Sequence, residues 1–317
     1  IEFDRAILAS GSSPFYPEPF SSIKDALTDS DKIFDIENYP QKLGIIGAGV
    51  IGLEMACFFN ALGTEVSIIE ILPNMLPYED EQIVRILKNS LEKRGVKFHF
   101  STRSREIKTG GKGKIIVLES GEKIEADEIL IAAGRKANLA GLNLEKAQIK
   151  SGKWITVNAN LQTSNPNIYA VGDINGISLL AHSAERQGEI AAKNIMGGNE
   201  TFNPLIVPKC VYTWPEIASV GMTKKEIEKK GVNVKFKRAY FQSLSRAIAS
   251  GSPEGMCQII TDETGAILGA QIVGGPATEI IHTLALAVRF KMKMEDLKSV
   301  IYAHPTMSEI IKEAINR

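Results

Sequence analysis

The first 150 residues alternate short apolar runs with longer stretches in which apolar side chains recur every three or four positions. A run of branched and small residues at 43–46 is followed by a glycine-rich stretch at 47–52, a helical pattern at 53–62 and a second apolar run at 65–69. Short apolar runs are typical of buried strands, and helical spacing is typical of amphipathic helices. The pattern predicts a strand, a tight turn, a helix and a second strand, which is the repeating unit of an α/β fold.

The same alternation continues to about residue 200. Apolar positions at helical spacing predict a helix from Asp80 to about Arg94. Residues 15–42 mix prolines with aromatic residues, and we expect loop and linker there, with a short helix near 22–28. The remaining expected elements are strands at 6–9, 96–100, 115–118, 123–126, 127–132, 156–158 and 168–171 and a helix at 183–196.

The last third of the chain has a different order of elements. Strands are expected at 207–212, 218–220, 235–240, 256–261 and 267–273, and helices follow at 277–290, 294–300 and 307–315. Because strands come first and helices come afterwards, this part predicts a separate α+β domain. The chain shows no internal repeat and no low-complexity tract.

Composition and charge exclude several classes of protein. The 317 residues carry 37 Lys and Arg against 37 Asp and Glu, so we expect no nucleic-acid-binding surface. No apolar run approaches the roughly 18 residues that indicate a membrane span, and no secretory signal is visible. The three cysteines, Cys57, Cys210 and Cys257, form no CxxC or CxxxxC pair. We therefore expect a cytoplasmic protein with buried thiols, no membrane contact and, because no two histidines have ligand spacing, no metal site.

The chain opens in the middle of a predicted strand, without an initiator Met. The apolar run at 6–9 leads directly into Ser10, Gly11 and a serine–proline turn. This start is typical of a domain whose front has been removed, and we expect the sequence to be the later part of a longer protein.

The glycine-rich stretch has the spacing that a dinucleotide pyrophosphate requires. Gly47 allows the tight turn, Gly49 lets backbone N–H groups approach phosphate, and Gly52 lets the helix pack against the strand. The first N–H groups of that helix, at Val50 and Ile51, offer a partial positive charge to an anion. The alternative is a strand–helix–strand unit that binds nothing.

An acidic residue at the end of the second strand indicates which dinucleotide is bound. Glu70 follows the glycines by about 20 positions, where a carboxylate binds the two ribose hydroxyls. A carboxylate at this point repels a 2′-phosphate, so we expect NAD rather than NADP.

A second candidate site follows the strand at 168–171. Asp173 comes directly after that strand and can accept hydrogen bonds from a polyol. Ala181 opens a helix whose first N–H groups point towards the same region. The alternative is an aspartate that only caps a turn.

The third candidate is a histidine near the C-terminus. His304 precedes a proline, and Glu309 lies five residues later in the first turns of the next helix. This spacing allows the carboxylate to fold back onto one imidazole nitrogen and raise the basicity of the other, as an acid–base catalyst needs. The alternative is a histidine that caps the helix beside a solvated glutamate.

Taken together and in this order, the motifs resemble those of the two-dinucleotide flavoprotein disulfide reductases, and most closely the dihydrolipoamide dehydrogenase branch. The ending TMSEIIKEAINR after His304 also looks like that branch. The resemblance is carried by Glu70 and by ASGSSP (9–14), GAGVIGLE (47–54), AAGRKAN (132–138), YAVGD (169–173), LLAHSAERQG (179–188) and AHPTMSE (303–309).

This resemblance implies an α/β fold with a Rossmann-like NAD-binding domain, the remainder of an FAD domain and a C-terminal α+β dimerisation domain. The implied division is residual FAD-domain segment and linker at 1–40, NAD-binding domain at 41–136, FAD-domain return at 137–204 and interface domain at 205–317. The implied partners are a second copy of the chain and, in the intact enzyme, the lipoyl domains of a 2-oxoacid dehydrogenase or glycine cleavage complex.

The resemblance also implies a role for each candidate residue. His304 is implied to exchange protons with dihydrolipoamide thiols, with Glu309 orienting its ring. For FAD, Ser10 and Gly11 line the crevice, Asp173 holds the ribityl chain, Ala181 contacts the isoalloxazine through its backbone, and Glu54 faces the flavin and pairs with a lysine. For NAD, the implied contacts are Gly47, Gly49, Val50, Ile51, Gly52, Glu70 and Gly134, with the backbone near Ser104 at the adenine side.

The sequence departs from the family pattern in one respect. The first GxGxxG, the CxxxxC redox pair and its nearby lysine precede the segment matching 9–11 in the family, and these 317 residues do not contain them. We therefore expect this polypeptide by itself to bind NAD without turnover and to bind FAD weakly or not at all. Two alternatives stay open: a reductase for coenzyme A or another small thiol, and a non-catalytic NAD-binding or dimerisation module.

Overall fold

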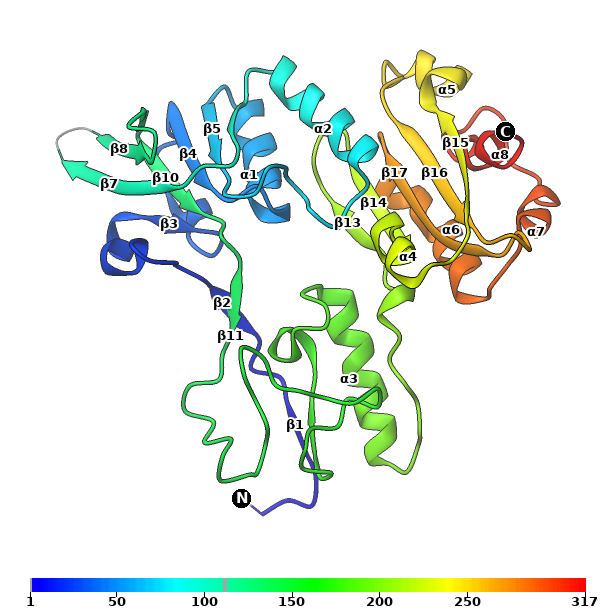
Figure 1. Ribbon diagram of the computed structural model, residues 1–317, viewed down its shortest axis with the longest axis horizontal. Helices are drawn as coiled ribbons and strands as arrows, with labels where there is room; N and C mark the ends of the chain where they lie inside the picture. The colour runs from blue at the N-terminus through cyan, green and yellow to red at the C-terminus, as the bar shows by residue number, and fades with distance from the viewer. Residues whose placement is uncertain (1, 111–112) are drawn as a thin grey trace. The chain divides into compact units, whose positions relative to one another are not determined.

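The computed structural model describes residues 2–110 and 113–317 and divides the chain into two compact units (Figure 1). Unit 1 consists of Ile1–Phe15 and Gly134–Val207, and unit 2 consists of Tyr16–Ala133 and Pro208–Arg317. Each unit thus combines two segments that are far apart in the sequence. Residues 16–40, which we expected to belong with the first 15 residues, lie in unit 2.

The first half of unit 2 is built on a parallel five-stranded sheet. Its strand order is β3-β10-β4-β5-β6, and the helices α1 and α2 connect β4 to β5 and β5 to β6. This is the predicted α/β unit. The bounds are β3 Thr28–Asp29, β4 Lys42–Ile46, α1 Val50–Ala61, β5 Glu65–Ile69, α2 Glu81–Lys93, β6 Lys97–His99 and β10 Glu128–Ile131.

Strand β3 corrects our expectation of a loop across residues 15–42. Thr28 and Asp29 pair with Leu130 and Ile131 and so extend the sheet by one edge strand. The expected short helix is a 3-10 helix, Phe20–Ala26, and a second one covers Ile33–Asp35. A two-residue strand has no periodicity of its own, so no pattern could have revealed it.

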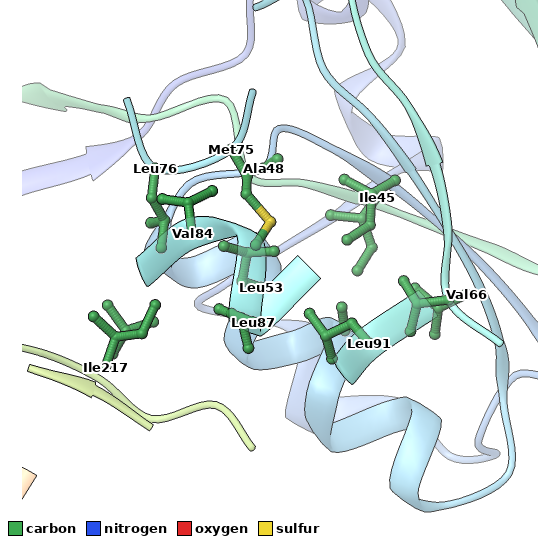
Figure 2. Packing of buried hydrophobic residues seen from close by; sticks show 14 of the residues in the cluster. Ile45, Ala48, Leu53, Val66, Met75, Leu76, Val84, Leu87, Leu91 and Ile217 are labelled. Atoms are coloured by element: carbon green, nitrogen blue, oxygen red, sulfur yellow. The ribbon is translucent and has the colours of Figure 1, made fainter. Parts of the chain in front are cut away.

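Helices α1 and α2 bury their apolar faces in one core with the sheet (Figure 2). Leu53 of α1 and Leu87 and Leu91 of α2 are fully buried. Burying each such side chain contributes about 1.5–3 kcal/mol. Ile217, from the second half of unit 2, belongs to the same cluster, so the two halves of unit 2 share a core.

A small antiparallel sheet covers part of the parallel one. It consists of β7 Ser104–Gly110, β8 Gly113–Leu118 and β9 Lys123–Ala126. A Cβ at Gly44 of β4 would lie 2.4 Å from Cδ1 of Ile116 in β8, so a larger residue there would displace the end of the Ile116 side chain. Strand β7 was not predicted. Its sequence SREIKTG has a single large apolar side chain, Ile107, and therefore shows no alternation of apolar and polar positions.

The second half of unit 2 is an antiparallel sheet with helices. The strand order is β13-β14-β17-β16-β15, and three of these strands match their predicted bounds. The short helices α4 and α5 were not predicted. The bounds are β13 Lys209–Val211, β14 Ile217–Gly221, α4 Lys224–Lys230, β15 Lys235–Tyr240, α5 Ser245–Ala249, β16 Met256–Thr261, β17 Ile267–Val273, α6 Ala277–Arg289, α7 Met294–Lys298 and α8 Glu309–Ile315, with a 3-10 helix at Phe241–Ser243.

This antiparallel sheet, which we call the interface sheet, is buried on both faces along its central strands β14, β17 and β16. Alternate residues such as Ala218 and Ile272 pack in a cluster with Ile281 and Leu284 of α6. Apolar residues at intervening positions, such as Ile217 and Val273, pack in the core shared with α1 and α2. The side-chain period of two along a strand explains this division.

Unit 1 is built from two pairs of short strands and one long helix. Strand β1 Ala6–Leu8 pairs in parallel with β12 Ile168–Ala170, and β2 Ser12–Pro14 pairs antiparallel with β11 Arg135–Ala137. Helix α3 covers Ala181–Ile195, with 3-10 turns at Gly172–Asn175 and Pro204–Ile206.

The strand expected at 156–158 does not form. The carboxamide oxygen of Asn158 accepts hydrogen bonds from the backbone N–H groups of Asn160 and Gln162, both at 3.0 Å. Asparagine favours such turns because its side chain imitates a backbone carbonyl, and here this preference overrides the short alternating pattern.

Candidate functional site

The three glycines of the turn after β4 each meet a different steric demand. Gly47 has a φ of +112°, and a Cβ there would lie 2.4 Å from the carbonyl oxygen of Ala132. A Cβ at Gly52 would lie 2.1 Å from the carbonyl oxygen of Gly47, so only glycine lets α1 start this close to the turn. At Gly49 a Cβ would meet nothing within 4 Å. The turn is therefore closed on the protein side and open at Gly49.

The start of α1 presents uncapped backbone groups. Gly49 is the N-cap and supplies no side-chain hydrogen bond, and Val50 is partly exposed. The first N–H groups of a helix lack partners within the helix and carry a partial positive charge, so this end of α1 suits a phosphate.

The Glu70 carboxylate lies against the same turn. Its Oε2 accepts a hydrogen bond from the backbone N–H of Ala48, and its Oε1 accepts one from Leu72, both at 2.8 Å. A carboxylate has about four lone-pair positions, so two acceptor positions stay available for a pair of ribose hydroxyls. Spacing alone did not reveal the hydrogen bonds from Ala48 and Leu72.

The segment after β6 runs beside Glu70. The backbone N–H of Glu70 donates to the backbone carbonyl of His99, and the backbone carbonyl of Glu70 accepts from the N–H of Thr102. Ser104 is buried, and its hydroxyl donates to the carbonyl of Glu106 at 3.4 Å. Thr102, rather than Ser104, makes the direct backbone contact with Glu70, and the contact expected near Ser104 stays a prediction.

Unit 1 gathers a polar cluster around Asp173. The Asp173 carboxylate accepts a hydrogen bond of 2.5 Å from the Ser12 hydroxyl. Ser12 in turn accepts from Arg135, whose Nε lies 2.7 Å from the hydroxyl and whose Nη2 lies 2.8 Å from the carbonyl. Asp173 therefore ties β2 and β11 to the end of β12, which is more than the capping of its own turn. We had not singled out Ser12 and Arg135, although both lie in the motifs at 9–14 and 132–138.

The loop at Ser10 and Gly11 is held by Asn138. The Ser10 hydroxyl donates to the Asn138 carbonyl at 2.8 Å, and the Asn138 N–H donates to the Gly11 carbonyl at 3.0 Å. A Cβ at Gly11 would meet nothing within 4 Å. Ala181 begins α3, and its N-cap Leu180 supplies no side-chain hydrogen bond. These residues present an open turn and an uncapped helix start, which fit a ligand with polar groups.

Gly134 and Glu54 belong to different units. Gly134 lies in unit 1 with a φ of +111°. Glu54 lies on α1 in unit 2, and its Oε1 accepts a hydrogen bond of 2.8 Å from the backbone N–H of Tyr212. Burial raises the pKa of the Glu54 carboxyl, and the Tyr212 hydrogen bond opposes that rise. Their roles toward NAD and the flavin stay predictions.

His304 and Glu309 form the contact that their spacing suggested. Nδ1 of His304 lies 3.1 Å from both carboxylate oxygens of Glu309. The His304 side chain is 70% exposed, whereas that of Glu309 is 12% exposed. Glu309 also accepts from the backbone N–H of Thr306 at 3.0 Å, and this bond, with His304, lowers its pKa. The N-cap of α8 is Ser308, so His304 does not cap that helix.

The three cysteines are free thiols. Cys257 is fully buried, whereas Cys57 and Cys210 are only half-buried, which corrects our expectation of three buried thiols. Burial raises the pKa of Cys257 to about 12 and that of Cys210 to about 11. Thiols with raised pKa values are poor nucleophiles at neutral pH.

Among the residues that the structure describes, no helix has the length and apolar character to cross a membrane.

Comparison with known proteins identifies the family. Residues 1–188 match the family model described as pyridine nucleotide-disulphide oxidoreductase, and residues 207–315 match its dimerisation domain. The chain belongs to the pyridine nucleotide-disulphide oxidoreductase family. It is thus grouped with NAD-dependent flavoprotein disulfide oxidoreductases, and the dimerisation-domain match supports formation of a homodimer.

Individual members of the family resemble the chain over nearly its whole length. The dihydrolipoyl dehydrogenase of Thermus scotoductus is 38% identical over 316 residues, which cover 97% of this chain and 68% of the relative. That of Bacillus subtilis is 38% identical over 320 residues, covering 99% and 69%. The chain therefore spans about two thirds of the length of these relatives.

Solved structures show the same fold. The crystal structure of LpdA from Mycobacterium tuberculosis superposes with a TM-score of 0.91 at 28% identity, covering 98% of this chain and 68% of that one. The HOCl-induced flavoprotein disulfide reductase RclA from Escherichia coli, in its Cu(II) complex, superposes with a TM-score of 0.92 at 25% identity, covering 100% and 74%.

Proposed function

We propose that this chain belongs to a dihydrolipoamide dehydrogenase and that its unit 2 binds NAD at the glycine turn and Glu70. The observation that carries the NAD site is the Glu70 carboxylate hydrogen-bonded to the Ala48 N–H within the turn. The uncapped start of α1 supports it, because phosphate and ribose are then recognised side by side. The 38% identity to dihydrolipoyl dehydrogenases supports the substrate.

Two dinucleotides serve the intact enzyme under this proposal. NAD and FAD supply hydride and electron transfer when bound, and the protein orients them. The residues present fit both: the turn at Gly49 is open, and in unit 1 Asp173, the Ser10–Gly11 loop and the start of α3 offer acceptors and donors to a polyol and a flavin. FAD binds this 317-residue polypeptide weakly or not at all, because these residues alone leave most of so large a ligand exposed.

His304 holds and moves the proton of the thiol substrate. Glu309 contacts Nδ1, so it selects the tautomer in which Nε2 carries the lone pair and stabilises the charged ring when Nε2 takes a proton. The exposed ring leaves Nε2 accessible to a thiol. We infer that the thiol comes from a lipoyl group and that the homodimer forms through the interface domain at residues 205–317.

The polypeptide itself binds NAD without catalysing turnover. No two of its cysteines have the CxxxxC spacing, and the thiols present have raised pKa values, so it lacks a reactive disulfide to accept electrons.

Calorimetry and a turnover assay test the proposal. We expect titration of the chain with NAD to give saturable binding with one site per chain, and dihydrolipoamide with NAD to give no NADH. Absence of NAD binding at millimolar concentration would contradict the nucleotide site. NADH production by the purified chain would contradict the claim that it cannot turn over.

A further inference from the structure

The loop between β5 and α2, residues 71–80, touches the predicted NAD site at its start. The N–H of Leu72 donates to Oε1 of Glu70 at 2.8 Å, and the N–H of Leu76 donates to the carbonyl of Ala48 at 3.3 Å. The 71–80 loop therefore holds both the ribose-binding carboxylate and the glycine turn. Any shift of this loop moves the groups that are to recognise NAD.

The far end of the same loop is fixed to the interface sheet by Glu79. Its side chain is buried, with 8% of the residue exposed. Oε1 of Glu79 accepts from the Ser219 hydroxyl of β14 at 3.0 Å, and Oε2 accepts from Nε2 of Gln271 of β17 at 2.7 Å. These partners lie 140 and 192 residues away in the sequence. We call this group of three side chains the Glu79 clamp.

The residue after Glu79 continues the attachment. Asp80 caps α2 by accepting from the N–H of Gln82 at 2.9 Å, and its second oxygen lies 3.5 Å from Nε2 of Gln258 in β16. Gln258 pairs with Gln271, and Gln271 pairs with Ser219, across the three central strands. A polar row on the interface sheet thus receives the end of the 71–80 loop.

Apolar side chains flank this polar row on the same face of the sheet, and that makes its polarity informative. Ile217, Met256 and Val273 lie on the same face of the sheet and pack in the shared core. Burial raises the pKa of the Glu79 carboxyl, while Ser219, Lys209 and Gln271 oppose the rise. Well-packed apolar side chains often stabilise a buried position as well as a polar cluster does, whereas directional hydrogen bonds specify one register. The clamp is therefore suited to position rather than to bulk stability.

We propose that Glu79 is a positioning residue for the nucleotide site, because its hydrogen bonds to Ser219 and Gln271 set where the 71–80 loop holds Glu70 and Ala48. This inference rests on the proposed binding of NAD at Glu70. It adds that the interface sheet, more than a hundred residues away in sequence, determines nucleotide affinity.

Variants of the full 317-residue chain test the clamp with two readouts, NAD affinity by calorimetry and amide exchange at Leu72 and Leu76. Glu79→Ala is expected to weaken NAD binding about tenfold and to speed exchange at both amides. Glu79→Gln keeps the side-chain shape and one acceptor for Ser219, and its new NH2 group can donate to the carboxamide oxygen of Gln271 after that amide rotates. This variant is expected to keep affinity within about twofold of the wild type. Glu81→Ala, at the exposed neighbouring position, is the matched control and should change neither readout.

A triple variant separates positioning from stability. Glu79→Leu with Ser219→Ala and Gln271→Leu replaces the clamp by apolar groups and leaves no buried partner unpaired. We expect its denaturation midpoint to stay close to that of the wild type while NAD affinity falls about tenfold. Wild-type affinity and unchanged exchange at Leu72 and Leu76 in this variant would overturn the proposal. Should the wild-type chain not bind NAD, the proposed function fails, but the exchange rates still decide whether the clamp holds the loop.

Discussion

The Glu70 carboxylate accepts a hydrogen bond of 2.8 Å from the backbone N–H of Ala48, 22 residues earlier in the chain. This bond joins the end of β5 to the glycine turn after β4. A hydrogen bond to a charged group contributes about 1.5–3 kcal/mol, so it fixes the carboxylate at the turn before any ligand is present. The acidic residue and the phosphate-binding backbone are thus arranged together.

Substitutions at Gly49 and Gly52 should have different effects: the first should weaken NAD binding, and the second should lower the stability of the fold. Gly52→Ala places a Cβ 2.1 Å from the Gly47 carbonyl, and we expect a loss of about 1–3 kcal/mol in the free energy of unfolding. Gly49→Ala meets no protein atom within 4 Å, so stability should stay within about 0.5 kcal/mol while NAD affinity falls. Urea denaturation and calorimetry measure the two effects. Equal destabilisation by both substitutions would refute the assignment of Gly49 to the ligand.

Glu309 should stabilise the chain in a defined pH range. The Thr306 N–H and His304 lower the pKa of the Glu309 carboxyl in the folded chain. The ionised carboxylate therefore adds to the free energy of unfolding above the unfolded pKa of about 4.3, and this stabilisation is lost as pH falls through the folded pKa. We expect Glu309→Gln to lower Tm at pH 7 and to have little effect near pH 2. A Tm difference that does not change between these pH values would contradict the contact. Glu295→Gln, at an exposed glutamate of α7, serves as the control.

The ionised carboxylate of Glu54 should destabilise the folded chain, whereas that of Glu309 stabilises it. Burial raises the folded-state pKa of Glu54, so the ionised carboxylate disfavours folding above that pKa and the penalty disappears below the unfolded pKa. Glu54→Gln retains an acceptor for the Tyr212 N–H without the charge. We expect it to raise Tm at pH 7 and to leave Tm nearly unchanged at about pH 4. A lower Tm at pH 7 would show that the charge of Glu54 stabilises the chain.

The elements with strong periodicity could be predicted from sequence, and the weakly patterned ones could not. The glycine spacing and the apolar runs were enough for β4, α1 and β5, because one local pattern specifies each of them. Strand β3, by contrast, exists only because Thr28 and Asp29 meet the edge of β10. Its partner lies about 100 residues away, and no local signal reports such a pairing.

The candidate site residues, too, could be found from the sequence only where a local spacing singled them out. His304 and Glu309 were found because five residues separate them, and Glu70 was found because its distance from the glycines is characteristic. The Glu79 clamp was missed because Ser219 and Gln271 are unremarkable in sequence and meet Glu79 only through the packing of the interface sheet. Likewise, Ser12 and Arg135 become interpretable only when β2 pairs with β11.

The most direct test of the nucleotide site is calorimetry of the wild-type chain and of Glu70→Gln with NAD and with NADP. Glu65→Gln, at the exposed start of the same strand, is the control. We predict that the wild type binds NAD at least about tenfold tighter than NADP, a difference of about 1.4 kcal/mol, and that Glu70→Gln loses most of this preference. Equal affinity of the wild type for both nucleotides, or an unchanged preference in Glu70→Gln, would contradict the account.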